Sequence, residues 1–181
     1  IWRISVKIPE LMSLLMQENE LGKVIHTHIH IENLINEYLS CVLCSPENIK
    51  PINLDYFGKV HLALAIGFPN ELKKPLLQLG KIRNSFAHKL NSNIDSNYMN
   101  NFYYSFSSEQ REMMMRIAKE TNQPWVVESL SWKDVPSSDK FAYLCISLYY
   151  FCNYSIDIQK TEQAYNKIGR IALTHFATES K

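Results

Sequence analysis

The segment from Arg83 to His88 contains the residues of this chain best suited to chemistry on a phosphate. Arg83 carries a permanent charge and a fixed fork of N–H donors that fits a phosphate group, and the imidazole of His88 can exchange a proton near neutral pH. Asn84 adds an amide between them. RNA supplies its own nucleophile, the 2′-hydroxyl, so its cleavage needs only cationic stabilisation and proton transfer. The segment therefore makes RNA cleavage a candidate activity.

These residues do not converge on a single helix. Arg83 and His88 are five positions apart, which is about 140° around a regular helix, whereas Asn84 and His88 share a face. Arg83 instead falls at the edge of the apolar face of its helix, where a charge needs an anionic partner. Two explanations stay open, a structural ion pair or a phosphate-binding position in a groove shared by two helices or two subunits. The candidate structural partners are Glu32, Asn33 and Glu37.

The charge of the chain is nearly balanced, but one stretch is basic. The formal net charge is +1 over 181 residues, so any contact with a polyanion must come from a local concentration of cations. Around Arg83 there is such a concentration, because residues 73–89 contain no acidic side chain. The predicted RNA-binding lysines of this stretch are Lys73, Lys74, Lys81 and Lys89.

The elements that must position these side chains are expected to be helices. Glycine is scarce, with five residues, and apolar positions recur at helical spacing. We expect helices over about 9–17, 21–43, 54–66, 75–90, 108–120 and 138–176, the last with a break near 153–158. Residues 91–101 are expected to form a loop with a helical turn near 98–104, and 122–137 an irregular segment. With 46% hydrophobic residues, the sequence predicts one all-α domain over 1–181, a bundle of about five to seven helices.

Specific residues mark some helix ends. Asn53 is the expected N-cap of the third helix and Gly67 its stop. Ser107 and Gln110 have the spacing of a capping box, which predicts the start of the helix over 108–120.

The motif resembles that of a known family. Arg83-Asn84-x-x-x-His88 on an all-α chain is similar to the R-x4-6-H signature of the HEPN superfamily, whose residue after the arginine is commonly polar. Residues 57–67, followed by 76–79 and 81–88, resemble the mannitol operon repressor (MtlR-like) branch, which pairs a helix ending in a Leu-Gly type turn with an R-N-x-F-A-H helix. The resemblance covers about 21–90, the motif-bearing part, whereas the C-terminal helical part, about 107–177, shares only the all-α pattern.

This resemblance implies a function and a partner. Many HEPN proteins are metal-independent ribonucleases that act as toxins, with or without an antitoxin, or as phage-defence effectors, through a groove between two subunits. By similarity, Arg83 would bind the scissile phosphate, Asn84 would orient it and His88 would transfer a proton, in a homodimer with no cofactor. Other members, the MtlR-like branch among them, are non-catalytic regulators or protein-binding modules. Both functions stay open.

A second distinctive string is His26-Thr27-His28-Ile29-His30. His26 and His30 are four apart and could ligate a metal, but a third ligand of suitable spacing is missing. An auxiliary role of His26, His30 and Glu32 beside the motif helix is the second alternative, and an ordinary polar helix face the third. His28 and Glu32 have the spacing of a simple surface pair. We favour the ordinary face and predict no metal.

The remaining features suggest structure rather than chemistry. Cys41, Cys44, Cys145 and Cys152 lack the spacing of a zinc ribbon, and reduced thiols packed as small apolar residues are expected. The aromatic runs at 102–106 and 149–151, and the methionine run at 113–115, are expected mainly in the core, although one methionine must reach the surface. No apolar run approaches the roughly 20 residues that span a bilayer, and a cytoplasmic protein is expected.

Overall fold

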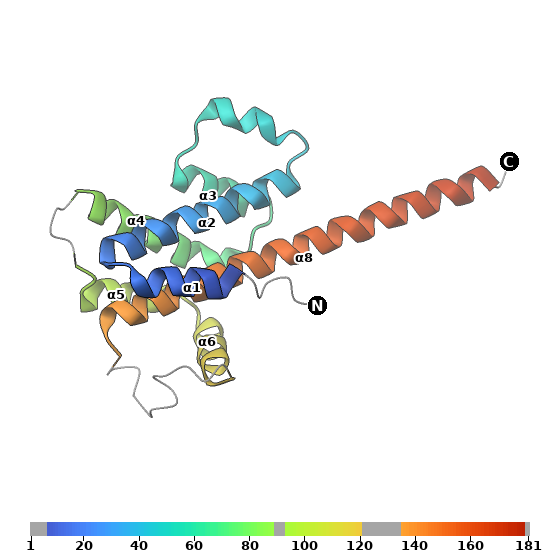
Figure 1. Ribbon diagram of the computed structural model, residues 1–181. Coiled ribbons are helices and arrows are strands. Elements are labelled where there is room, and N and C mark those ends of the chain that lie inside the picture. Colours follow the sequence, from blue (N-terminus) through green and yellow to red (C-terminus); the bar gives the residue numbers. More distant parts are fainter. Residues whose placement is uncertain (1–6, 89–92, 121–134, 180–181) are drawn as a thin grey trace.

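The structure, a computed structural model, describes residues 7–88, 93–120 and 135–179. These residues are helical, with no strand among them, which confirms the predicted all-α class (Figure 1). In chain order the elements are α1 (Lys7–Gln17), α2 (Glu20–Val42), the 3₁₀ helix η1 (Pro46–Ile52), α3 (Tyr56–Ala65), the 3₁₀ helix η2 (Asn70–Leu72), α4 (Lys73–His88), α5 (Ser96–Tyr103), α6 (Ser108–Glu120) and α8 (Ser137–Glu179).

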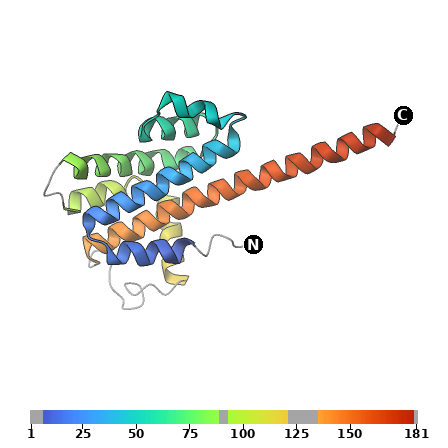
Figure 2. The same cartoon turned by 45° about the horizontal axis from the view of Figure 1, so that its top comes forward.

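Helix α2 is the centre of the bundle. It packs on α8, α4, α3 and α1, while α1 and α5 also pack on α8. Figure 2 shows α2 and the first half of α8 side by side, with α4 along the other side of α2. The contact between α2 and α8 includes a buried lysine, because Lys23 Nζ lies 2.6 Å from Ser138 Oγ and 3.9 Å from Asp139 Oδ1. The motif helix α4 is thus held against α2 and α3, away from α1.

The helix ends follow local chemistry. The side chains of Asn19, Asp55 and Asp95 accept hydrogen bonds from the backbone three residues later, at 2.8, 2.8 and 2.9 Å, which satisfies N–H groups of the first turn. The predicted capping box is confirmed: Ser107 N donates to Gln110 Oε1 at 2.9 Å and Gln110 N donates to Ser107 Oγ at 3.2 Å.

The cap prediction for α3 was half correct. Gly67 follows α3 with a φ of 109°, a conformation that glycine adopts without strain. The N-cap, however, is Asp55 and not Asn53, which ends η1 in a left-handed conformation with a φ of 51°. Asparagine tolerates that conformation, so Asn53 serves the end of one element instead of the start of the next.

Two further predictions about elements were wrong. The loop expected over 91–101 ends at Ser96, where α5 begins two residues before the helical turn predicted near 98–104; Asp95 caps this helix, whose Met99 and Phe102 are buried. The break expected near 153–158 does not occur, because no proline interrupts 137–179 and Ser155 Oγ donates to Phe151 O within the helix, at 2.8 Å. The irregular segment expected at 122–137 lies almost wholly outside the described residues.

The core is one cluster of side chains from the packed helices. Residues 141–149 of α8 are buried, which explains why this stretch is apolar on every side. Phe102 and Phe106 lie in the core as expected, whereas Tyr104 is 67% exposed. Met114 is buried and Met113 is exposed, so the methionine run divides between core and surface as predicted.

All four cysteines are free thiols. Cys145 and Cys152 are buried in the core and Cys41 is half-buried, as expected for thiols packed as small apolar residues, whereas Cys44 is exposed and does not have this role. Burial raises the pKa of the Cys145 thiol to about 12 and raises that of Cys152 as well. None of the helices in the described part of the chain has the length and apolar character needed to cross a bilayer.

Candidate functional site

The motif residues lie in the last two turns of α4. Pro75 is in the first turn, where its missing N–H costs nothing, and the buried face of the helix follows the spacing of Leu76, Leu79, Ile82 and Phe86. This face packs on α2 and α3. The sequence therefore fixes the rotation of α4 and with it the direction of the residues beside the buried face.

Arg83 is half-buried at the edge of this face. Its guanidinium donates from Nη1 to Oδ1 of Asn84, its neighbour in sequence, at 3.1 Å. The Nε atom is buried and has no hydrogen-bond partner. A buried N–H without an acceptor is unfavourable by about 1–3 kcal/mol and more when the group is charged, so the guanidinium is under-satisfied in the isolated chain.

The carboxylates suggested as structural partners of Arg83 are engaged elsewhere. Glu32 Oε1 accepts from Lys59 Nζ at 2.6 Å, and Glu32 Oε2 lies 3.8 Å from His28 Nδ1. Glu37 pairs with Lys160 at 2.5 Å. Within the described ranges, Arg83 belongs to no ion pair. The structural explanation left open by the sequence therefore loses its two expected carboxylate partners, and the third suggested partner, Asn33, is exposed on α2.

His28 is the residue of this region that the sequence prediction passed over. It is buried and not on a simple polar surface, because its ring lies 4.3 Å from the ring of Tyr56, measured between centroids. Tyr56 is fixed in turn by donating its hydroxyl hydrogen to Leu76 O at 3.0 Å. One signal in the sequence points to this placement: His28 lies between Val24 and Ile31 on the apolar stripe of α2.

The electrostatics around His28 are dominated by burial and by cations. Burial lowers the pKa of His28 below its ordinary value of 6.5; the negative charge of Glu32 opposes this shift, and the positive charges of Arg83 and Lys59 add to it. These four side chains, His28, Glu32, Lys59 and Arg83, are called the Arg83 cluster below. With His28 neutral the cluster holds two cations and one carboxylate, so it carries a net positive charge.

His88 is not part of the Arg83 cluster. It is exposed in the final turn of α4, while Arg83 faces the bundle. Because α4 is a regular helix over this span, the two residues are separated by about 140° of rotation and about 7.5 Å of rise. Within one chain, the helix holds the phosphate-binding and proton-transfer groups on different sides, as expected from the spacing.

The predicted RNA-binding lysines are spread along α4. Lys73 and Lys74 are exposed in the first turn, and Lys81 is exposed two residues before Arg83. Lys89 lies outside the described residues. Of the described lysines, Lys81 is the nearest in sequence to Arg83, while Lys73 and Lys74 are at the opposite end of the helix.

The auxiliary histidines are directed to other neighbours. His26 Nε2 lies 3.5 Å from Glu18 Oε1, and the ring of His30 meets that of Tyr149 edge-on, with centroids 6.2 Å apart. Glu32, in contrast, lies in the Arg83 cluster. No group of three or more potential metal ligands gathers in the described parts of the chain.

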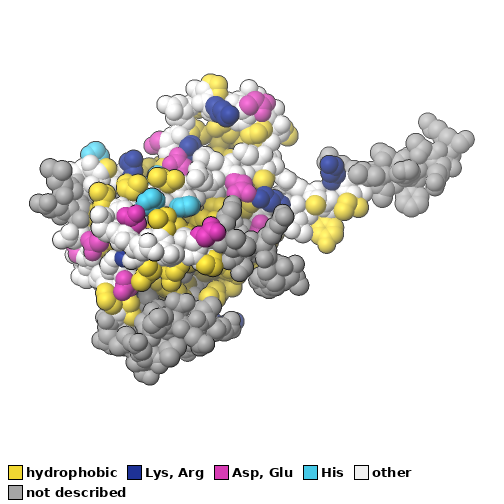
Figure 3. Space-filling model, viewed as in Figure 1, with side chains coloured by type: hydrophobic (Ala, Val, Ile, Leu, Met, Phe, Trp, Pro, Cys, Tyr) yellow, Lys and Arg dark blue, Asp and Glu magenta, His cyan; other side chains and the backbone are white. Residues whose placement is uncertain are grey.

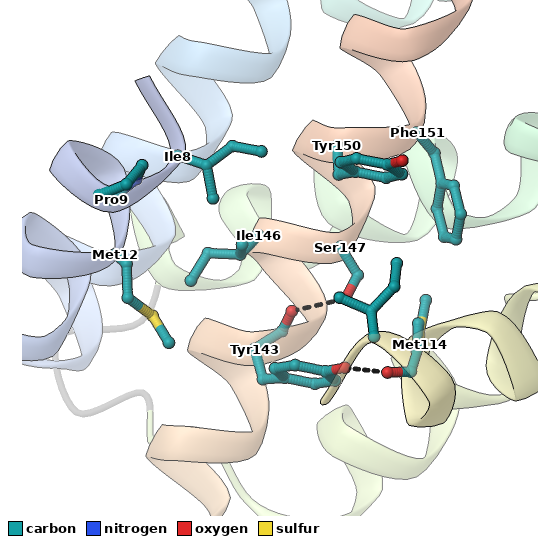
Figure 4. Close-up of a pocket in the computed structure, with 10 residues that line it drawn as sticks. Ile8, Pro9, Met12, Met114, Tyr143, Ile146, Ser147, Tyr150 and Phe151 are labelled. Atoms are coloured by element: carbon teal, nitrogen blue, oxygen red, sulfur yellow. Dashed lines mark hydrogen bonds between the residues drawn. The ribbon is translucent and has the colours of Figure 1, made fainter. Parts of the chain in front are cut away.

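An apolar cavity lies elsewhere, between α1, α6 and α8 (Figure 4). It has a volume of ≈ 350 Å³ and is lined by side chains such as Ile8, Met12, Ile146 and Tyr150, with no ionisable acid or base other than tyrosine. Tyr143 donates to Met114 O at its edge. Such a lining offers no group for hydrolytic chemistry.

Comparison with known proteins adds no relative: no family model, curated protein or solved structure matches this chain. The class of protein must therefore be argued from the site itself.

Proposed function

We propose that this chain is a metal-independent endoribonuclease of the HEPN type, with Arg83, Asn84 and His88 as its active residues. The observation that supports the proposal is the half-buried Arg83 guanidinium, whose buried Nε has no hydrogen-bond partner and which forms no ion pair with a carboxylate among the described residues. A phosphate would supply the missing negative charge and the missing acceptor together.

In this proposal the chemistry follows from the groups available. Arg83 binds the non-bridging oxygens of the scissile phosphate and stabilises the charge that builds up on them. Asn84, which accepts from Arg83, holds the guanidinium in place. An imidazole removes the proton of the 2′-hydroxyl, whose oxygen attacks phosphorus while the bond to the 5′-oxygen breaks. The products are a 2′,3′-cyclic phosphate and a 5′-hydroxyl, and the leaving oxygen takes up a proton.

A second copy of the chain would complete the site. One helix holds Arg83 and His88 on different sides, whereas two α4 helices related by a two-fold axis can bring Arg83 of one copy near His88 of the other. The exposed position of His88 is compatible with such a contact. A role as toxin or defence effector, and an antitoxin or regulatory partner, remain predictions from the resemblance.

The test is incubation of the purified chain with mixed RNA in excess chelator. Arg83→Gln and His88→Ala should each lower the cleavage rate by about 10²-fold or more, because each removes a stabilising or proton-transferring group. The matched controls are Arg116→Gln and His61→Ala, which remove exposed side chains of the same types from α6 and α3. These controls should cleave like the wild type.

Equal cleavage by the wild type and both motif variants would exclude the proposed site. Absence of any cleavage by well-folded wild-type chain, over a broad set of RNAs, would favour the alternative, a non-catalytic regulatory or protein-binding module of the MtlR-like kind. Cleavage that the chelator abolishes would contradict the metal-independent mechanism.

A further inference from the structure

The second half of α8 projects beyond the bundle. The last contacts of α8 with α2 are Lys160 with Glu37, at 2.5 Å, and Gln163 Nε2 with Cys41 O, at 2.6 Å. After Gln163 the helix continues to Glu179, a distance of about 24 Å at 1.5 Å per residue. Figures 1 and 2 show this part standing free of the other described elements.

The outward side of α8 carries a row of large apolar residues. Tyr154, Ile158, Tyr165 and Ile168 are 49%, 44%, 71% and 63% exposed. They are separated by four, seven and three residues, so all four fall within about 80° of one another around the helix. In Figure 3 the hydrophobic side chains of the projecting part gather along its lower side. We call these four residues, with Thr161 between them, the α8 stripe.

The α8 stripe is opposite to the side that packs in the bundle. Cys152, Ile156 and Gln163 contact the interior or α2 and lie about 160–200° from Tyr154 around the helix. The stripe is therefore not a frayed edge of the core. It is a second apolar face on the same helix, and it continues towards the bundle through Tyr150, whose ring stacks on Tyr154 with centroids 6.2 Å apart.

The spacing of the stripe is that of a coiled-coil seam. If Ile158 and Tyr165 occupy the a positions of a heptad repeat, the d positions are those of Tyr154, Thr161 and Ile168. An apolar repeat of 3.5 residues is typical of a helix that packs along another helix. Solitary helical arms are marginally stable in water, and the exposed tyrosines and isoleucines make this one costly to solvate.

We propose that the α8 stripe is the interface with a second copy of this chain, formed by two antiparallel α8 helices. The charges near the stripe fit a second copy, because over residues 154–168 the carboxylates of Asp157 and Glu162 equal in number the cations of Lys160 and Lys167, so two stripes do not repel each other through a net charge. An antiparallel register centred on residue 163 places Ile158 against Ile168 and Thr161 against Tyr165, so that isoleucines meet and each tyrosine is opposite a small residue.

This inference is independent of the proposed ribonuclease activity. The stripe is on α8, opposite to the side that contacts α2, whereas the motif is on α4, which packs on α2 and α3. A chain that uses both surfaces would form a tetramer if the two kinds of two-fold axis close the assembly, and a larger assembly otherwise. Loss of the α8 interface would then lower the mass to half or less and leave the α4 contact intact.

The first experiment measures the mass of the full chain by sedimentation. The double variant Tyr165→Glu/Ile168→Glu places charges in the seam at exposed helical positions, so it should fold normally and lower the mass measured for the wild type to half or less. The control is Asn166→Glu, which adds one of these two charges to an exposed residue about 100° from Tyr165, outside the seam. Its mass should equal that of the wild type. A double variant with unchanged mass, or a wild type that is already monomeric, would overturn the proposal.

The second experiment tests orientation by disulfide formation in a Cys41→Ser/Cys44→Ser background. Residues 158 and 168 are about 15 Å apart along one helix and cannot bridge within a chain. The variant Ile158→Cys/Ile168→Cys should therefore give a covalent dimer under mild oxidation, and the single variant Ile158→Cys distinguishes the orientations because its two cysteines face each other only in a parallel pair. Ile158→Cys alone should stay uncrosslinked. Efficient crosslinking of this single variant would indicate parallel helices and overturn the proposed register.

Discussion

The charge balance at Arg83 can be tested by the variant Arg83→Met. Methionine keeps an unbranched stem to fill the same space but removes the guanidinium and its buried, unpartnered Nε. Removing one partner of a buried ion pair costs about 3–5 kcal/mol, because the other charge is left uncompensated. Since Arg83 has no such partner in the described part of the chain, and Lys59 is a like charge in its cluster, we expect Arg83→Met to change the free energy of unfolding by at most about 1 kcal/mol.

The assay is urea-induced unfolding followed by circular dichroism, with the slope of the transition compared between variants. For a chain of this size, 1 kcal/mol corresponds to about 2–4 °C in Tm, so a loss of a structural ion pair would lower Tm by roughly 6–20 °C. The pKa of His28 gives an independent readout, because the positive charge of Arg83 lowers it and the variant should therefore raise it. A destabilisation of about 3 kcal/mol, or a His28 pKa that falls, would refute the assignment of Arg83 as an uncompensated cation.

Three further predictions follow from the packing and burial. Gly80→Ala should lower Tm by about 2–4 °C in a thermal melt, because the new Cβ would lie 2.8 Å from Cζ of Phe57. Alanine is the better helix former, so a higher Tm would show that the rings of Phe57 and Tyr56 move aside. Burial lowers the pKa of His28 below 6.5 in the folded chain, so the unfolded chain binds the proton more tightly. The free energy of unfolding should therefore fall as the pH drops below about 6.5 towards the folded-state pKa. Urea unfolding across that range should show this pH-dependent decrease in the wild type and not in His28→Asn. A thiol reagent should modify exposed Cys44 in the native chain but leave buried Cys145, whose pKa is raised to about 12, unmodified until unfolding; rapid native modification at Cys145 would contradict its burial.

The spacing of apolar residues and the helix-capping residues were sufficient to predict most of the helices. The apolar spacing of 75–90 predicted the helix that carries the motif, and the pair Ser107 and Gln110 predicted the start of α6. Predictions were wrong where the same residue types are typical of two different structures. Asparagine and serine near residues 91–101 suggested a loop, but Asp95 caps a short helix there whose burial of Phe102 depends on contacts distant in sequence.

The site was predictable only in part. Spacing alone indicated that Arg83 and His88 diverge on one helix, and the regular course of α4 agrees with this. The choice of Lys59 as the partner of Glu32 depends on how α3 packs on α2, which the spacing along either helix does not encode. The same packing turns His28 inward against Tyr56, so a residue expected in a surface pair becomes a buried one whose pKa the charge of Arg83 helps to lower.

The proposed cleavage chemistry is tested most directly by analysis of the RNA ends produced in excess chelator, from one oligonucleotide and from its fully 2′-O-methylated form. The wild-type chain should convert the unmodified RNA to fragments with 2′,3′-cyclic phosphate and 5′-hydroxyl ends. The methylated form should stay intact because its nucleophile is blocked. Cleavage of the methylated RNA, fragments with 3′-hydroxyl ends, or undiminished cleavage by Arg83→Gln would contradict the proposed chemistry.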